Sequence, residues 1–396
     1  MAEQKRCLAC GNNPTSHTLA WLGQSSNVFT SPIHTWLSQS FLARAASAIT
    51  GPLISAFITI YRLLGILKVN TDITKTVNQR GKVLWEEAAH RGISMHNFLA
   101  FGKPVDLYGA TIKGKKFYFN GLPRPLRTPN SSEWWIDDKF LVKQLLQKAG
   151  LPVAPGGVFS QFSPLLKKFH ELNKPVIIKP RLGSRGRHTT THITTEADLR
   201  KAFERAKQLC YWVILEEHLT GPVDRATIID GKLAGVLAGY PPRVTGDGTH
   251  TITELVAIKN QNKPKGVSNV VVTEEHINFL SRLGLTLQDI LPAGKTIDLL
   301  LNIGVSYGGS SGEVTSSTHP EIKRILEQAA AVVGDPIIGF DFIIPDRTKS
   351  PSEQKWGIIE CNGLPFINLH YNPIEGTTNN VAKYVWNYVE EHIDQF

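Results

Sequence analysis

The sequence has few cysteines, no low-complexity tract and no internal repeat, and each absence excludes a class of protein. Four cysteines in 396 residues do not make a disulfide-stapled scaffold, and they fit a reducing, cytoplasmic compartment. The lack of repeats excludes solenoids and propellers. Hydrophobic residues make up 41% and charged residues 19%, which is the balance of a globular chain long enough for two or three packed domains.

The chain also lacks any dense run of lysine and arginine with interleaved aromatic residues, so we expect no nucleic-acid partner. Lysine and arginine nevertheless outnumber aspartate and glutamate by 43 to 34, which gives a net charge of +9. A positive surface favours anionic partners such as nucleotides, acidic metabolites or anionic membranes. We interpret the excess as a basic active-site cleft, with the other charges on solvated faces.

No secretory signal is evident at the amino terminus. Residues 45–61 form an uncharged stretch between Arg44 and Arg62 that could contact a membrane. The stretch is short for a span, contains Gly51-Pro52 and is diluted by serine and threonine, so we expect buried helices there instead. Residues 1–70 otherwise show little pattern and are predicted to be an N-terminal extension.

Cys7 and Cys10 have the C-x-x-C spacing of metal ligands, and His17 lies close to them in sequence. A structural zinc site usually has four protein ligands. The sequence shows no second C-x-x-C motif that would complete such a site. We therefore expect two incidental thiols in the N-terminal extension.

Hydrophobic periodicity and capping signals predict regular structure from about residue 78 onward. The predicted helices cover residues 82–91, 139–149, 196–209, 320–333 and 378–393. The predicted strands cover residues 111–119 (a hairpin), 175–180, 211–215, 226–230, 232–238, 337–344 and 356–361. A proline-rich stretch at 123–129 marks a domain boundary. The alternation indicates α+β or α/β domains with antiparallel sheets.

A glycine-rich basic loop follows one of the predicted strands. Lys179 closes the strand, and Gly183, Ser184 and Gly186 lie in the loop after it. Small residues let backbone N–H groups approach phosphate oxygens, and the lysine adds a positive charge. The segment is not a Walker A motif, because no helix begins with Gly-Lys-Ser/Thr. Taken alone, such a loop is more often a hairpin turn whose arginines are solvated.

Two later strands carry acidic side chains where burial is expected. Glu360 and Asn362 alternate on one strand and therefore face the same side, and Asp341 lies on a neighbouring strand. Two carboxylates and an amide oxygen form a hard oxygen site, suited to Mg²⁺ (or Mn²⁺) held jointly with nucleotide phosphates. The alternative is two buried acids with unrelated hydrogen bonds, but unpaired buried carboxylates are costly, which favours a cation.

The predicted strand 211–215 ends in Glu216 and Glu217 and leads on to Leu219. A strand that enters a linker can offer backbone groups to the edge of an adenine. One of the two glutamates can then bind the adenine amino group or the ribose. The alternative is a plain strand end that faces solvent.

Together and in this order, these three elements resemble the ATP-grasp superfamily, over roughly residues 133–392. Each piece alone is unspecific, whereas the set is specific. The chain is most similar to the ATP-grasp module of cyanophycin synthetase and, more weakly, to D-alanine–D-alanine ligase. The segments that carry the closer resemblance are Arg243–Val256, Leu291–Gly294, Gly308-Gly309, Glu313–Thr315 and His319-Pro320.

The resemblance implies an α+β ATP-grasp fold in which two α+β subdomains grip ATP. The N-terminal subdomain would span residues 131–215. The C-terminal subdomain, with the metal site, would span residues 216–396. Residues 71–130 would form a small pre-ATP-grasp region after the extension at 1–70.

The resemblance also implies roles for individual residues. Nucleotide binding falls to Lys139, Lys179, Gly183, Ser184, Gly186, Glu216, Glu217 and Leu219. The metal ligands are Asp341, Glu360 and Asn362. The candidates for stabilising the transferred phosphate or the substrate carboxylate are Arg185, Arg225 and Arg243. The family's ribose-binding acid falls near Val223, which leaves Asp224 as its substitute.

The activity implied is ATP- and Mg²⁺-dependent carboxylate–amine ligation through an acylphosphate, with a small-molecule or peptide substrate such as an amino acid. The alternatives are an ATP-grasp enzyme of another class, such as a kinase, and a non-catalytic nucleotide-binding protein. The chain departs from cyanophycin synthetase at Ala238-Gly239, where an arginine pair is common. It also has no Mur-ligase-like segment, so we expect a different acceptor. The oligomeric state, including a homo-oligomer, stays open.

Overall fold

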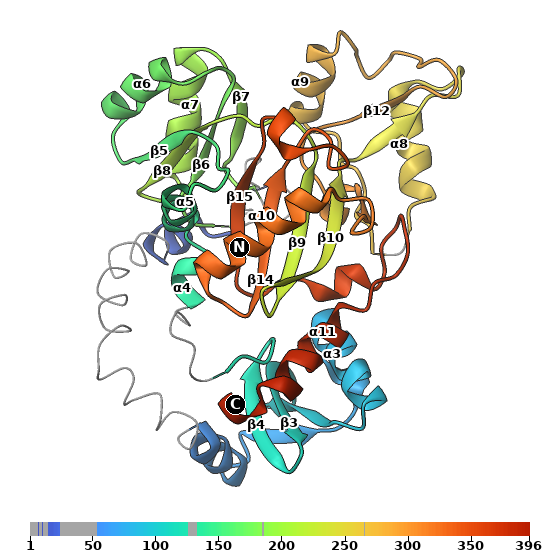
Figure 1. Ribbon diagram of the computed structural model, residues 1–396. Coiled ribbons are helices and arrows are strands. Elements are labelled where there is room, and N and C mark those ends of the chain that lie inside the picture. Colours follow the sequence, from blue (N-terminus) through green and yellow to red (C-terminus); the bar gives the residue numbers. More distant parts are fainter. Residues whose placement is uncertain are drawn as a thin grey trace.

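The computed structural model of the protein describes residues 7, 10, 15–23, 54–125, 133–183, 186–264 and 266–396. Over these ranges the strands form four sheets, and the paired strands within each sheet run antiparallel (Figure 1). Helices alternate with the strands along the chain. The expectation of a mixed α+β chain with antiparallel sheets is therefore confirmed.

One sheet is built from residues 67–120 and is covered by two helices from opposite parts of the chain. Its strands are β1 (Leu67–Asn70), β2 (Ser94–Ala100), β3 (Lys103–Ile112) and β4 (Lys115–Asn120). Helix α3 (Gln79–His90) and the late helix α11 (Val381–Glu391) contact each other on it (Figure 1). The indole Nε1 of the fully buried Trp386 donates to the Leu84 carbonyl at 2.8 Å. Segments far apart in sequence thus share one core.

A second four-stranded sheet carries the glycine-rich loop. Its order is β5 (Gly156–Phe159), β8 (Val213–Glu217), β6 (Val176–Pro180) and β7 (Thr190–Ile193). Helices α6 (Phe162–Glu171) and α7 (Glu196–Lys207) share an apolar core with it. Thr195 caps α7 as its sequence predicts, because its side chain accepts from the Asp198 N–H. The glycine-rich loop connects β6 to β7.

The central sheet has five strands and positions the expected acidic residues. Its order is β13 (Ser310–Glu313), β10 (Lys232–Tyr240), β9 (Val223–Ile229), β14 (Ile337–Ile343) and β15 (Gly357–Asn362). Helices α10 (Pro320–Val333) and α5 (Lys139–Lys148) cover one face, on which Ile228 and Phe340 are buried. Since side chains alternate along a strand, Arg225 and Asp341 point to the other face.

A smaller two-stranded unit is inserted after β10. It pairs β11 (Arg243–Thr245) with β12 (Thr296–Asp298) and includes α8 (Ile252–Gln261) and α9 (Glu274–Arg282). Thr251 and Glu254 form a reciprocal capping box at the start of α8. The unit has its own apolar core, which includes Val244 and Leu280.

Most predicted elements are present, with shifted ends. Helix α10 is confirmed, with Pro320 at its first turn and Gly334 in the left-handed conformation at its end. The predicted strand 211–215 begins only at Val213. Of the uncharged stretch 45–61, residues 54–61 lie in a helix and residues 45–53 lie outside the described residues. Within residues 54–61 only Ile58 is buried and the others are exposed, so the expected burial of this helix is wrong. Over the described ranges, no helix combines the length and apolarity needed to cross a membrane.

Candidate functional site

The open face of the central sheet carries three charged side chains in a row. The register of β9, β14 and β15 places Arg225 and Glu360 on either side of Asp341. The Arg225 guanidinium donates to both carboxylate oxygens of Asp341, Nε to Oδ1 and Nη2 to Oδ2, each at 2.7 Å. Asp341 raises the pKa of Arg225 above its ordinary value, so this arginine stays charged. The structure therefore brings one expected catalytic arginine to two expected metal ligands.

Asn362 lies on the same strand as Glu360 and is paired with Gly339. Its side-chain nitrogen is buried and has no hydrogen-bond partner among the described residues. Turning the amide over would place its oxygen there instead, since the two amide atoms are nearly indistinguishable in shape. Each Asp341 oxygen keeps a lone pair beyond its bond to Arg225. With Glu360, these oxygens form the kind of donor set that Mg²⁺ or Mn²⁺ takes, so the residues fit a divalent cation.

A second cluster consists of one buried glutamate between two lysines. Glu216, on β8, accepts from Lys143 Nζ at 2.7 Å through Oε1 and lies 2.8 Å from Lys179 Nζ through Oε2. Burial alone would raise the pKa of Glu216, but the two lysines outweigh it and lower the pKa below its ordinary value. Burial lowers the pKa of Lys143, which Glu216 partly offsets. The cluster keeps Lys179 fixed at the end of β6.

Lys139 connects the two sheets. It is the first residue of α5, and its Nζ donates to the Gly183 carbonyl at 2.5 Å in the loop after β6. The same Nζ lies 3.2 Å from Glu360 Oε1 on β15. A lysine at the N-terminus of a helix adds its charge to the positive end of the helix dipole. The place where the loop, α5 and β15 meet is therefore suited to an anion.

The turn before α5 is held by a further ion pair. The Asp138 carboxylate caps the helix by accepting from the backbone N–H groups of Phe140 and Leu141 at 3.0 and 3.2 Å. Arg181, in the loop after β6, lies with its Nη2 2.8 Å from Asp138 Oδ2. Both side chains are almost fully buried. This contact sets the position of the glycine-rich loop relative to Lys139.

The glycine-rich loop has the backbone that its sequence suggests. Gly183 and Gly186 both have positive φ, 115° and 62°, which L side chains rarely adopt. A side-chain carbon added to Gly186 would lie 3.9 Å from the Tyr307 hydroxyl, so the loop approaches the short helix Val305–Tyr307. Ser184 and Arg185, also expected at the site, lie outside the described residues.

Glu217 and Leu219 lie just beyond the buried cluster, where the chain passes to the central sheet. The Glu217 carboxylate accepts from the Asn173 backbone and side-chain nitrogens at 3.0 and 2.9 Å and from Lys355. Burial would raise the pKa of Glu217, but Lys355 and Asn173 lower it. Leu219 is buried. The Glu217 backbone N–H donates to the Pro155 carbonyl at 2.9 Å.

Asp224 and Arg243 lie apart from the charged row. Asp224 points to the helix-covered face of the central sheet, where Arg347 donates to both its oxygens at 2.6 and 2.8 Å. Burial raises the pKa of Asp224, and Arg347 offsets part of that rise. Arg243 stacks over the Tyr240 ring at 4.5 Å and lies 3.3 Å from Glu375. The structure therefore does not bring these two residues to Asp341 and Glu360.

Lys143 and Arg181 are two residues of this site that were not predicted from the sequence. Lys143 is four residues after Lys139, so the helical repeat puts both lysines on one side of α5, and this spacing could have identified it. Arg181 lies between two predicted ligands of the same loop. Its role as a partner of Asp138 becomes visible only in three dimensions, because the two residues belong to different elements.

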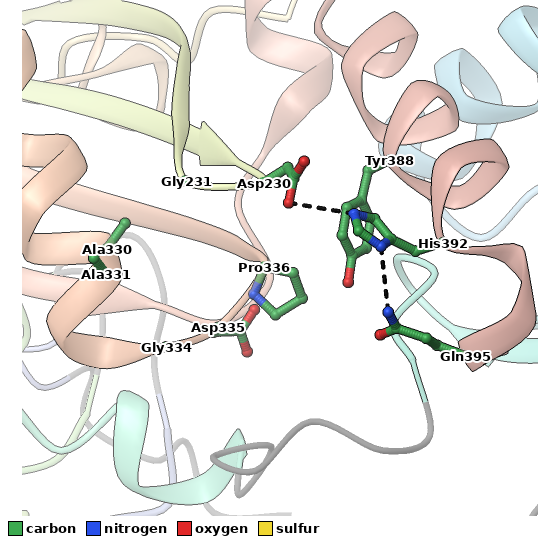
Figure 2. Close-up of a pocket in the computed structure, with 10 residues that line it drawn as sticks. All are labelled: Asp230, Gly231, Ala330, Ala331, Gly334, Asp335, Pro336, Tyr388, His392 and Gln395. Carbon is green, nitrogen blue, oxygen red and sulfur yellow. Dashed lines mark hydrogen bonds and ion pairs between the residues drawn. The ribbon is translucent and has the colours of Figure 1, made fainter.

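A separate cavity of about 240 Å³ lies at the other end of the central sheet. It is lined by the β9–β10 turn at Asp230-Gly231, by Gly334 and Asp335, and by His392 after α11 (Figure 2). Asp230 Oδ1 lies 3.7 Å from His392 Nε2. The turn is five residues along β9 from Arg225, or about 16 Å of extended strand, so the cavity is not part of the charged row.

Comparison with known proteins gives two groups of relatives, while no family model matches. Cyanophycin synthetase from Synechocystis sp. is 32% identical over 254 residues, which cover 62% of this chain and 29% of that enzyme. The glutathione biosynthesis bifunctional protein GshAB from Streptococcus mutans is 32% identical over 244 residues, 59% of this chain and 32% of that protein. The chain thus spans about a third of the length of these relatives.

Among solved structures, a bifunctional glutathione synthetase from Pasteurella multocida has a TM-score of 0.58 and 24% sequence identity. The match covers 79% of this chain and 43% of that one. This likeness establishes the ATP-grasp fold. The resemblance to cyanophycin synthetase that the sequence motifs indicate is likewise confirmed.

Proposed function

We propose that this ATP-grasp protein is an ATP- and Mg²⁺-dependent carboxylate–amine ligase that acts through an acylphosphate. The observation that carries the proposal is the position of Lys139. Its ammonium group contacts both the glycine-rich loop at Gly183 and the carboxylate of Glu360. Predicted phosphate-binding groups and predicted metal ligands from two different sheets therefore meet at Lys139, which supports phosphoryl transfer from a nucleotide.

The residues of the two sheets would share the binding of ATP. Lys139 and Lys179 would bind phosphate oxygens, and the Glu216 carboxylate would hold Lys179 in position. The backbone near Glu217 and Leu219 would bind the adenine edge. Asp341, Glu360 and Asn362 would hold Mg²⁺, which would supply positive charge to offset the phosphate charge.

Arg225 has a distinct task in the proposed reaction. A substrate carboxylate oxygen attacks the γ-phosphorus of ATP, the bond to the bridging oxygen breaks, and ADP leaves. Arg225 stays charged because Asp341 pairs with it, so it can stabilise the negative charge of the acylphosphate. An amine then attacks the acyl carbon, loses a proton, and releases phosphate. The glycine-rich loop would cover the acylphosphate and exclude water.

The relatives support a synthetase that joins small building blocks. They are named as cyanophycin synthetase and as a glutathione biosynthesis protein. We infer from these names that the substrates of this chain are amino acids or short peptides. The net charge of +9 agrees with an acidic substrate, although ATP alone also calls for a positive cleft.

The experiment is a phosphate-release assay with ATP, Mg²⁺ and a panel of amino acids and short peptides. We expect a subset of the panel to stimulate release, and Glu360→Gln to lower the stimulated rate by at least about 100-fold, because one ligand charge is lost. Glu204→Gln is the matched control, since Glu204 is exposed on α7, and it should keep the wild-type rate.

The outcomes separate the alternatives. Stimulated release that Glu360→Gln abolishes, with a new C–N bond in the product, supports the ligase. Phosphate transferred stably to the substrate would point to a kinase-like reaction. If the wild-type chain binds ATP but no compound stimulates phosphate release, ligation of these compounds is excluded. A non-catalytic nucleotide-binding role then becomes the favoured alternative.

A further inference from the structure

Four potential metal ligands meet where the N-terminal segment contacts the sheet of β5–β8. They are Cys7, Cys10, His17 and His188, and one ligand atom from each lies within 4.8 Å of all the others. Three come from the first seventeen residues, and the fourth comes from the connection between β6 and β7. Sequence spacing suggested the first three, but the missing fourth ligand argued against a site. The structure supplies it from 178 residues beyond Cys10.

Three of the six distances between these atoms are sulfur–nitrogen distances close to those of a tetrahedral metal site. His188 Nε2 lies 3.6 Å from Cys7 Sγ and 3.4 Å from Cys10 Sγ, and His17 Nε2 lies 3.3 Å from Cys10 Sγ. Zinc bonds of about 2.3 Å to sulfur and about 2.0–2.1 Å to nitrogen, at tetrahedral angles, give a sulfur–nitrogen separation of about 3.6 Å. The cluster therefore has the dimensions that a zinc ion would impose.

The surroundings of His188 orient it as a ligand. Its Nδ1 lies 2.7 Å from the Arg205 carbonyl oxygen, which can only accept, so Nδ1 carries the proton. The lone pair of Nε2 is then directed at the two sulfurs, which is the arrangement typical of histidines that bind metals. The side chain is 1% exposed.

The two cysteines lie on a tight turn. The Cys10 backbone N–H donates to the Cys7 carbonyl at 3.1 Å, which brings both sulfurs to the same side. The Cys10 side chain is buried, with 4% exposed. The buried thiol of Cys10 and the half-buried thiol of Cys7 face two imidazoles and form a soft donor set, unlike the carboxylates of the charged row.

We infer that Cys7, Cys10, His17 and His188 bind one structural Zn²⁺ ion. Four protein ligands leave no open position, so the ion has no catalytic role. It joins the N-terminal segment to the connection between β6 and β7, two residues after Gly186. The helix at residues 17–23 also contacts this part of the fold, since the Trp21 and Tyr211 rings are 6.5 Å apart. The ion thus anchors one end of the glycine-rich loop.

The test is the metal content of the purified full chain, measured by mass spectrometry. We expect about one zinc per chain in the wild type, and less than about a tenth of that in the double variant Cys7→Ser/Cys10→Ser and in His188→Ala. The matched controls are Cys210→Ser and His170→Ala, which remove a cysteine and a histidine outside the cluster and should keep the zinc.

Two further measurements use the wild-type chain, so the proposal stays testable if a variant fails to fold. Production in cobalt-supplemented medium should give the visible bands of tetrahedral Co²⁺ and a thiolate-to-cobalt charge-transfer band. A mercurial reagent titrated into the folded protein should release the zinc as two thiols react. Wild-type protein without zinc and without the cobalt bands would overturn the proposal, as would cluster variants that keep as much zinc as the controls. None of these readouts depends on the ligase activity.

Discussion

Glu216 is a single buried carboxylate that holds two lysines near the proposed nucleotide site. Its oxygens lie 2.7 Å from Lys143 Nζ and 2.8 Å from Lys179 Nζ. Two buried ammonium groups repel each other unless an anion lies between them. The residue therefore stabilises the fold and keeps Lys179 in place at the same time.

Replacing Glu216 by glutamine tests whether its negative charge stabilises the fold. At pH 7 we expect Glu216→Gln to lower the free energy of unfolding by about 3–5 kcal/mol, because two buried cations lose their partner. The lysines lower the pKa of Glu216 from its ordinary 4.5, so its stabilisation is complete above that value and is lost as the pH falls through the lowered native pKa. Urea unfolding from pH 7 to pH 3 measures both effects.

The difference between wild type and Glu216→Gln should consequently shrink toward acidic pH. Glu204→Gln, an exposed substitution of the same kind, should differ little from wild type at any pH. A Glu216→Gln difference that stays constant down to pH 3 would show that its charge does not stabilise the fold.

Helix α5 contributes several of the residues at the candidate site. It begins with the capping residue Asp138, presents Lys139 and Lys143, and packs on the central sheet through Val142 and Leu146. Since Asp138 also pairs with Arg181, one carboxylate fixes both the start of the helix and the loop after β6.

We predict that Asp138→Ala lowers both stability and ATP binding. The loss of the cap alone costs about 1–2 kcal/mol, and the unpaired buried Arg181 adds to it. Because the loop and Lys139 lose their common anchor, the KM for ATP should rise about tenfold or more. Thermal unfolding and steady-state kinetics measure the two effects.

Thr195→Ala is the matched control for this prediction, because Thr195 caps α7, which packs on the sheet of β5–β8. It should cost about 1 kcal/mol of stability and leave the KM for ATP unchanged. An Asp138→Ala protein with the same kinetics as Thr195→Ala would contradict the positioning role.

Elements with strong local signals were predictable from the sequence. Helix α10 combines a capping residue, a proline at its first turn and a glycine at its end, and each is a local rule. Strand β8 was misplaced at its start, because Tyr211 and Trp212 are as apolar as a strand residue yet precede it. Local patterns define the type of an element better than its ends.

The site could be predicted only for residues that stand out from their neighbours in the sequence. Lys179 ends a strand before glycines, and Asp341 and Glu360 interrupt apolar strands, so each stands out in sequence. The spacing from Lys139 puts Lys143 on the same side of α5, but only the fold shows that this side meets Glu216, 73 residues later. The fourth ligand of the cysteine cluster was missed for the same reason, since His188 comes close to Cys10 only through the fold.

At the scale of the whole molecule, the shared core of α3, α11 and the sheet of β1–β4 joins distant parts of the chain. Trp386 is fully buried in it and reaches the Leu84 carbonyl. Arg91, after α3, adds an ion pair with Glu390 on α11 at 2.7 Å. The sheet and the late helix should therefore unfold together.

We predict that Trp386→Ala costs about 3–5 kcal/mol of stability, through lost burial and an unpaired carbonyl. Residues 67–120 should lose protection from hydrogen exchange together with 381–391, because they share one core. Tyr384→Ala, on the same helix but 41% exposed, should have little effect. Unchanged protection in 67–120 after Trp386→Ala would show that the sheet is stable without α11.

The same packing sets an order of events while the chain is being made. A ribosome completes β4 at Asn120 about 260 residues before it begins α11 at Val381. At a synthesis rate of about 5–20 residues per second, the apolar face that Trp386 covers stays without this partner for roughly 13–50 seconds. We therefore expect the nascent chain to bind chaperones that recognise exposed apolar surface at the ribosome. We also expect the first sheet to be among the last parts to reach the native state.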